Sequence, residues 1–179
     1  MPTARTNNRS LCSGWLHLSK TSIHLMDDSM DHIYLRDSSQ NDHQFVNNLT
    51  REVMCLYVEN TWSDEENQER YYEINSFEQS NTQIISEHNK SIGRITLTQN
   101  KNEIIIDAIH LVPYVQGQGI GSKFLHNIIE HAVKQKKSVS LVVLRSNPAK
   151  KLYEHLGFVV YDETKERYFM RLAYIRKQL

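Results

Sequence analysis

The sequence predicts an α/β (α+β) domain with a mixed, mostly antiparallel central sheet of about six to seven strands, flanked by about four helices. Two observations carry this prediction. Residues 81–112 form β-rich runs broken only by turn-forming sequences, which indicates an antiparallel meander. After this meander, helical and strand-like segments alternate to the end of the chain, so further strands are expected to join the same sheet.

The segments before the meander predict one strand and two helices. Residues 32–37, HIYLRD, alternate as a first strand does. A helix is expected over residues 38–60 because apolar side chains recur there at helical spacing. They are Phe45, Leu49, Val53, Leu56 and Tyr57. Ser63 and Glu66 have the separation of a capping box, which predicts that a second helix begins at this point.

Within the meander, HNK (88–90) and QNKN (99–102) are typical turn sequences. A third helix is expected from residue 120 to the basic sequence KQKK, because positive charge suits a helix C-terminus. One face of this helix is apolar. It comprises Ile120, Phe124, Leu125, Ile128, Ile129, Ala132 and Val133.

The last third of the chain predicts a strand, a short helix and two closing strands. SVSLVVL (138–144) is typical of a buried strand. NPAKKLYEHLG (147–157) has Pro148 near its start and glycine at its end, as short helices do. FVVYD (158–162) and RYFMRLAYI (167–175) are expected to complete the sheet.

Composition favours one cytoplasmic domain that acts on a small or locally recognised ligand. The chain has 179 residues, with 21 Lys plus Arg against 21 Asp plus Glu, so no net charge attracts nucleic acid or an anionic membrane. Cys12 and Cys55 suggest neither a disulfide framework nor a structural zinc site. The longest apolar stretches are far shorter than the roughly 20 residues that span a bilayer.

The first 29 residues differ from the rest, and we expect an N-terminal extension over 1–29 followed by a domain over 30–179. The extension is rich in Ser, Thr and Asn and carries no acidic residue before Asp27. A flexible tail, a targeting segment and a start at Met30 all fit this composition.

Three alternating glycines, Gly117, Gly119 and Gly121, lie in VQGQGIGSKFL between the third meander strand and the next helix. Such a turn gathers backbone N–H groups at the positive end of a helix dipole, which favours phosphate. The spacing does not match GxGxxG, and Ser122 precedes Lys123 where a P-loop has the reverse order. A tight turn that only packs helix on strand is the alternative.

These residues resemble the GNAT superfamily of N-acetyltransferases. Gln116, Gly119 and Gly121 satisfy its acetyl-CoA motif. NPAKKLYEHLGF is similar to a second family signature, carried here by Asn147, Tyr153, Gly157 and Phe158. The order of predicted elements also matches, so the resemblance covers residues 32–174.

The resemblance implies acetyl-CoA as cosubstrate and no metal. It places the CoA pyrophosphate on the backbone amides of Gln116, Gly117, Gln118, Gly119, Ile120, Gly121 and Ser122. It implies that the pantetheine arm pairs with the main chain of Ile109, His110 and Leu111, in a gap between two splayed strands. It also implies that Asn147 reaches the cofactor from the other side.

Two side chains are candidates for proton transfer. The resemblance places Tyr153 near the sulfur as the general acid, because a phenol can donate a proton to the departing thiolate; packing in the core is the alternative. Asp107 is a charge within an apolar strand. The resemblance makes it the candidate general base, because in the family this strand often supplies a Glu or His base, at a position that varies; simple solvent exposure is the alternative.

Strand periodicity places Asp107 on one face with Ile105 and Ile109. In a regular strand, His110 then lies on the opposite face and contributes its main chain. The ribosomal-protein members of the family carry a glutamate base on the next strand. Here that position holds an aliphatic residue, Val142, which argues against a close functional equivalence with them.

The resemblance implies that the first two helices and their connection form the wall of the acceptor pocket. Residues 57–73 concentrate acidic side chains, and Tyr57 and Trp62 could flank a cationic amine; a solvated acidic helix start is the alternative. His126 and His131 lack the spacing of a metal site. We expect a monomer or homodimer that acts on a small-molecule or peptide amine.

Together these features predict an acetyl-CoA-dependent N-acetyltransferase. A primary amine would attack the thioester directly in a ternary complex. The alternative from another class is a non-catalytic GNAT-fold module that binds acyl-CoA in a sensor or assembly role.

Overall fold

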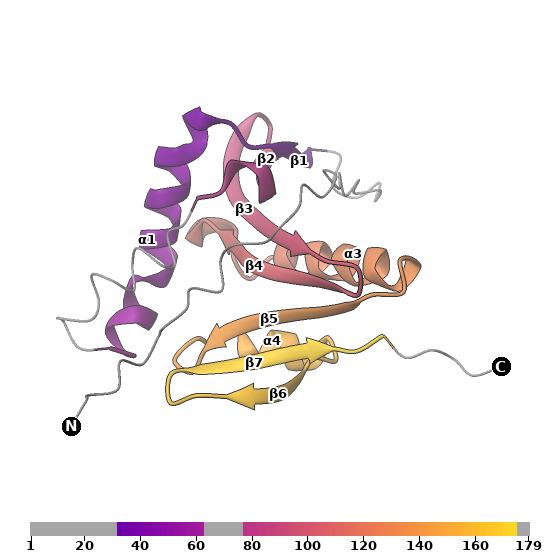
Figure 1. The fold of residues 1–179 in the computed structure, drawn as a ribbon. Helices are drawn as coiled ribbons and strands as arrows, with labels where there is room; N and C mark the ends of the chain where they lie inside the picture. Colours follow the sequence, from indigo (N-terminus) through magenta and orange to yellow (C-terminus); the bar gives the residue numbers. More distant parts are fainter. Residues whose placement is uncertain (1–31, 63–76, 175–179) are drawn as a thin grey trace, which may run out of the picture.

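The computed structural model describes residues 32–62 and 77–174. Within these ranges, seven strands form one sheet in the order β1-β2-β3-β4-β5-β7-β6 (Figure 1). The strands are β1 Ile33–Asp37, β2 Thr82–Glu87, β3 Lys90–Gln99, β4 Glu103–Leu111, β5 Ser138–Leu144, β6 Val159–Glu163 and β7 Arg167–Leu172. Only the β4–β5 pair is parallel, which confirms the predicted mixed, mostly antiparallel sheet.

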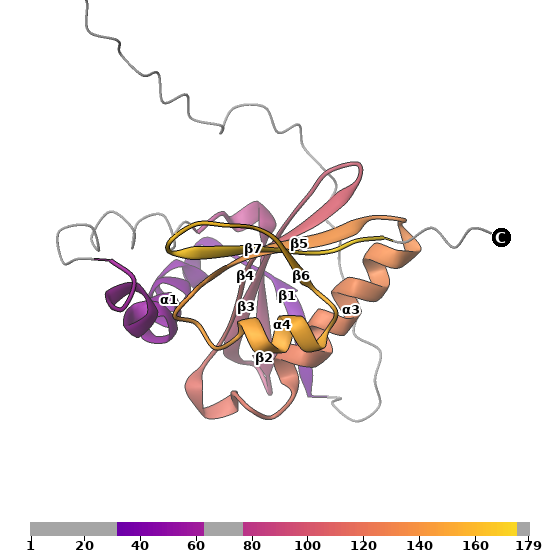
Figure 2. The same cartoon turned by 90° about the horizontal axis from the view of Figure 1, so that it is seen from below.

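Helices cover both faces of the sheet (Figure 2). α1 (His43–Glu59) lies on one face, and α3 (Ile120–Lys134) and α4 (Lys150–His155) lie on the other. Short 3-10 turns precede α1, β2 and α3 at Gln40–Asp42, Gln79–Asn81 and Pro113–Val115. The helix predicted to begin at Ser63 lies outside the described residues. Among the helices of the described ranges, none combines the length and the hydropathy needed to traverse a bilayer.

The larger part of the core lies under α3 and α4. Its central side chains are at most 2% exposed: Ile85, Ile92, Ile95, Phe124, Leu125, Ile128, Ala132, Val139, Phe158 and Met170. Burial of each large apolar side chain of this kind contributes about 1.5–3 kcal/mol before entropy is counted. The apolar face predicted for α3 supplies much of this core, although Val133 at its edge is 53% exposed.

The face of α1 that packs on the sheet differs from the predicted one. Val46, Leu49 and Val58 are buried where the helix packs on β3 and β4, whereas Leu56 is 69% exposed. Apolar residues occupy more than half of the circumference of this helix, so several sets of residues at helical spacing could form its buried face. Contact with the sheet selects one of them.

The connection between β1 and α1 is held by an ion pair. Both terminal nitrogens of Arg36 donate to the Asp42 carboxylate, at 2.9 and 2.6 Å. The Ser39 amide also donates to Asp42, at 2.7 Å. Hydrogen bonding from Arg36 lowers the pKa of the buried Asp42 carboxyl to about 2.

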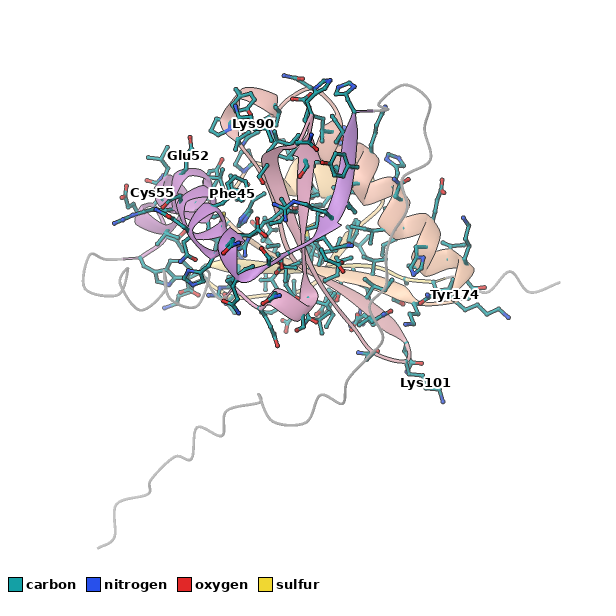
Figure 3. All side chains as sticks on the ribbon, turned by 90° about the horizontal axis from the view of Figure 1, so that it is seen from above. Phe45, Glu52, Cys55, Lys90, Lys101 and Tyr174 are labelled. Carbon is teal, nitrogen blue, oxygen red and sulfur yellow. The ribbon has the colours of Figure 1, made fainter. Side chains whose placement is uncertain are left out.

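The turns predicted within the meander are confirmed. His88 and Asn89 adopt left-handed backbone conformations between β2 and β3. Between β3 and β4, the Asn100 side-chain oxygen accepts hydrogen bonds from the amides of residues 102 and 103. Lys90 and Lys101, near the two ends of β3, mark the positions of these turns (Figure 3).

Close packing of β3 on β4 requires Gly93. A Cβ atom at this position would lie 2.6 Å from the His110 carbonyl oxygen and 2.7 Å from Leu111 Cδ2. Contacts this short cannot form without movement of the backbone. Gly93 therefore sets how closely the two strands approach.

Candidate active site

A cleft opens where β4 and β5 separate. The two strands pair from Glu103 opposite Ser138 to Ile106 opposite Leu141, and then diverge (Figure 1). The cleft has a volume of about 430 Å³ and receives residues from α1, β3, β4, β5 and α4. Its titratable side chains are Glu78, Arg94, Asp107, His110, Tyr153 and Arg167.

The glycine turn presents a row of backbone amides before α3. Gly117 and Gly119 have φ angles of +74° and +82°, and a Cβ atom on either would meet no protein atom within 4 Å. Glycine is therefore favoured at these two positions by the positive φ angle, and not by a lack of space for a side chain. At Gly121 φ is not positive, and an added Cβ would make an ordinary contact of 3.7 Å with Leu111.

This turn fits a diphosphate. In the described part of the chain, the amides of residues 117–122 donate no hydrogen bond to a protein acceptor. They precede a 15-residue helix, whose positive dipole end adds to their attraction for an anion. The Gln116 amide donates to the Pro113 carbonyl, and the Gln116 side chain donates to the Leu111 carbonyl at 2.7 Å. Gln116 therefore shapes the turn, and the amides available to a ligand begin at residue 117.

Asn147 and Tyr153 enter the cleft from the side of α4. The Asn147 side-chain oxygen accepts from the Ala149 amide at 2.9 Å and so starts the short helix. Tyr153 is 9% exposed, and its ring meets Phe158 edge to face with centroids 6.0 Å apart. Burial raises the pKa of Tyr153 to about 12. The phenol therefore stays protonated at neutral pH, as a proton donor must.

Asp107 lies at a β-bulge, which changes the predicted arrangement of faces. Thr96 pairs with Ala108 but Leu97 pairs with Ile106, so Asp107 is the extra residue. Beyond the bulge the alternation is inverted. Ile109 consequently packs on the core under α3, while His110 lies on the α1 face together with Asp107. The prediction that Asp107 and Ile109 share a face, with His110 opposite, is wrong for this reason.

The surroundings of Asp107 favour a proton acceptor. Its carboxylate is open to the cleft and accepts a hydrogen bond from Thr98 Oγ1 at 2.6 Å. Desolvation by the surrounding protein raises its pKa, and the negative charge of Glu78 acts in the same direction. The Thr98 hydrogen bond and the charge of Arg94 oppose this rise.

Arg94 was not predicted from the sequence as a residue of the site. Like Asp107, it is a charged residue within an apolar strand, and this feature could have identified it. Arg94 is 1% exposed, lines the cleft and donates from Nε to His110 Nδ1 at 3.3 Å. Burial lowers the pKa of Arg94 to about 10, so the guanidinium still carries its charge at pH 7. Burial, followed by the charge of Arg94, lowers the pKa of His110 to about 3.

Neither of the two residues predicted to flank the acceptor lines the cleft, but Trp62 contacts one of its lining residues. Its ring lies 5.4 Å from the guanidinium carbon of Arg167, a residue that lines the cleft. Tyr57 contributes mainly through its carbonyl, which accepts from Thr61 and Ser146 and ties α1 to the loop after β5. Most acidic residues of the 57–73 stretch lie outside the described residues.

Val142 of β5 lines the cleft. It occupies the position at which the ribosomal-protein members of the GNAT family carry a glutamate base. It is 48% exposed and pairs with Phe169 of β7. Among the described residues, Asp107 and Glu78 are therefore the carboxylates that this cleft receives.

A family model matches most of the chain. Residues 37–179 match the model of an acetyltransferase (GNAT) domain. A comparison with curated proteins finds no match.

Solved structures share the fold at low sequence identity. PaiA N-acetyltransferase from Thermoplasma acidophilum, in complex with coenzyme A, is 22% identical with a TM-score of 0.66, over 79% of this chain and 99% of that one. Arabidopsis thaliana Naa50, in complex with the bisubstrate analogue CoA-Ac-MVNAL, is 16% identical with a TM-score of 0.58, over 80% and 99%. N-acetylglutamate synthase from Neisseria gonorrhoeae, complexed with coenzyme A and L-arginine, is 15% identical with a TM-score of 0.57, over 81% and 34%. The family match spans most of the sequence, and the chain therefore belongs to the GNAT acetyltransferase family.

Proposed function

We propose that this protein is an acetyl-CoA-dependent N-acetyltransferase that acts on a primary amine. The observation that carries the proposal is the cleft between the splayed strands β4 and β5. One proton donor, Tyr153, and one proton acceptor, Asp107, both line it. Acetyl transfer to an amine needs both, since the amine loses a proton and the departing thiolate gains one.

The cofactor end of the site is proposed to be the glycine turn. The amides of residues 117–122 would bind the diphosphate of CoA, and Asn147 would contact the cofactor from the opposite side of the cleft. The main chain of residues 109–111 lies beyond the last β4–β5 pair, so its groups on that edge can pair with the pantetheine arm. When bound, acetyl-CoA supplies a thioester, whose C–S bond breaks as the C–N bond of the amide forms.

Asp107 is proposed to accept the proton of the acceptor amine, directly or through water. The size of this task depends on the amine. A lysine-like amine with a pKa near 10.4 is neutral in about one molecule per 10³ at pH 7, a cost of roughly 4–5 kcal/mol, whereas an α-amine costs roughly 1 kcal/mol. The raised pKa of Asp107 makes it a stronger base than an ordinary carboxylate.

Tyr153 is proposed to donate a proton to the thiolate of CoA. Its burial keeps the phenol neutral. Its ring is held by Phe158, so the hydroxyl direction does not depend on a flexible side chain. After the reaction the tyrosine regains a proton from solvent, and the protein returns to its starting state.

Two measurements on the purified protein test the proposal. Calorimetric titration with CoA and acetyl-CoA tests binding, and thiol release from acetyl-CoA tests turnover with a panel of amines. The panel contains α-amino acids, free lysine, polyamines and peptides. It includes the peptide MVNAL because the structural neighbour Naa50 was solved with an analogue that carries this sequence.

Saturable CoA binding and amine-dependent thiol release are expected. Binding without release for every amine would favour the non-catalytic acyl-CoA-binding module. Absence of CoA binding would exclude both functions.

A further inference from the structure

His110 is a titratable side chain of the cleft that the proposed reaction does not use. Strand register places it directly beside Arg94 of β3, which in turn lies beside Ile84 of β2. α1 covers this pair of side chains, and Thr50 Oγ1 lies 3.5 Å from His110 Nδ1. The guanidinium and the imidazole therefore meet beneath a helix, at the acceptor face of the cleft.

The hydrogen bond between them fixes the proton on the imidazole. Arg94 Nε–H is a donor, so His110 Nδ1 must be the acceptor and cannot carry a proton. Thr50 does not compete as a donor, because its hydroxyl donates to the Val46 carbonyl at 2.8 Å. A neutral His110 with this partner carries its proton on Nε2.

A second proton on His110 would meet two obstacles. It would break the bond from Arg94, and it would place a positive charge against a guanidinium that is 1% exposed. Among the described residues, the charged groups lining the cleft are Arg94 from β3, Asp107 from β4, Glu78 from the segment before β2 and Arg167 from β7. The α1 residue that touches His110 is the neutral Thr50. The two carboxylates favour a cation at His110, yet burial and Arg94 hold its pKa far below the usual range.

We propose that Arg94 is a positioning residue that divides the proton chemistry of the cleft between two side chains. It holds His110 as a neutral hydrogen-bond donor with its proton on Nε2, and it leaves Asp107 as the proton acceptor. The role of Asp107 rests on the proposed function. The state of His110 is a property of the free protein and can be measured without turnover.

The first test is ¹⁵N NMR of the histidine side chains in the wild-type protein between pH 5 and pH 8. The signals of His110 are identified by their loss in the variant His110→Gln. The expected result is a single neutral tautomer protonated on Nε2, with no titration in this range. A proton on Nδ1, or a midpoint within the range, would overturn the proposal.

The second test compares Arg94→Met with the conservative variant Arg94→Lys. Loss of the charge and the donor in Arg94→Met is expected to raise the pKa of His110 and to populate the Nδ1-protonated tautomer, and the ¹⁵N spectrum shows this tautomer directly. Arg94→Lys keeps a cationic donor and should retain the wild-type spectrum. Identical spectra for the two variants would contradict the proposal; if Arg94→Met does not fold, the wild-type and lysine spectra decide.

The third test is the pH dependence of kcat/KM. The charge of Arg94 lowers the pKa of Asp107, so Arg94→Met should move the acid limb to higher pH, whereas Arg94→Lys should not. A purely structural role of Arg94 would lower kcat/KM without moving the acid limb of the pH profile. An acid limb at the same pH in Arg94→Met and the wild type would therefore refute the coupling between Arg94 and Asp107. If no amine is turned over, the NMR result still stands, so failure of the proposed function and failure of this inference are distinguishable.

Discussion

The two parts of the proposed site are built from different materials. At the glycine turn, the groups are backbone amides without a protein acceptor among the described residues, and the backbone conformation of Gly117 and Gly119 sets their orientation. On the α1 face of the cleft, the groups are side chains from separate strands, such as Arg94 and Asp107, and burial and charge decide their protonation. The glycine turn is therefore sensitive to local backbone changes, and the cleft to charge and packing.

The largest expected effect lies at Tyr153, which lines the cleft. Replacement of Tyr153 by Phe removes the proton donor but keeps the ring that packs on Phe158. We expect kcat to fall about 10²–10⁴-fold, the range typical of a lost general acid. The dissociation constant for CoA should change less than about threefold, because the turn amides are untouched. Thiol release and calorimetry measure the two quantities, and an unchanged kcat would remove Tyr153 from the mechanism.

The sequence predicted the turn and the α4 end of the site well because their signals are local. Three alternating glycines, and the spacing from Asn147 to Tyr153, specify structure within a few residues of themselves. Both meander turns were predictable for the same reason, since Asn reports local conformation.

The α1 face was less predictable because its contacts depend on strand register. Arg94 and His110 are far apart in the chain and meet only through the β3–β4 pairing. The bulge at Asp107 inverts the faces that follow it, and the run EIIIDAIHL shows no break where it occurs. The identity of the buried stripe of α1, with Leu56 outside it, is likewise set by tertiary packing.

Gly93→Ala tests crowding where β3 pairs with β4, next to the cleft residue His110. The added Cβ would lie 2.6 Å from the His110 carbonyl oxygen, a backbone atom that cannot turn aside. We expect the free energy of unfolding to fall by about 2–3 kcal/mol, as for an overpacked core. Urea denaturation measures this change. Gly121→Ala, whose Cβ would make an ordinary contact, is the matched control, and equal stability of the two variants would contradict the crowding argument.

Gly119→Ala tests conformation at the turn, where crowding is absent. Alanine in the left-handed region costs about 1–2 kcal/mol, so CoA affinity should fall roughly tenfold as the turn relaxes from this geometry. Gly121→Ala, with no positive φ to maintain, should bind CoA within about twofold of wild type. Calorimetric titration compares the two. Equal affinities would mean that the amides do not depend on the conformation of Gly119.

The smallest expected effect is the loss of the Arg36–Asp42 ion pair in acid. It distinguishes loss of activity by protonation of Asp107 from loss of activity by unfolding. The pKa of Asp42 is lowered to about 2 in the folded protein by Arg36, against 3.8 for an ordinary Asp. Its stabilisation is therefore complete above about pH 4 and is lost as the pH falls toward 2.

Since Arg36 is partly exposed, solvent screening limits the loss to on the order of 1 kcal/mol. Asp42→Asn should flatten this part of the curve of unfolding free energy against pH. The acid limb of activity from Asp107, whose pKa is raised, should lie at higher pH, where the Arg36–Asp42 pair is still intact. If Asp42→Asn shifts that limb, the loss of activity in acid reflects unfolding, and the assignment of Asp107 as proton acceptor loses its support from the pH profile.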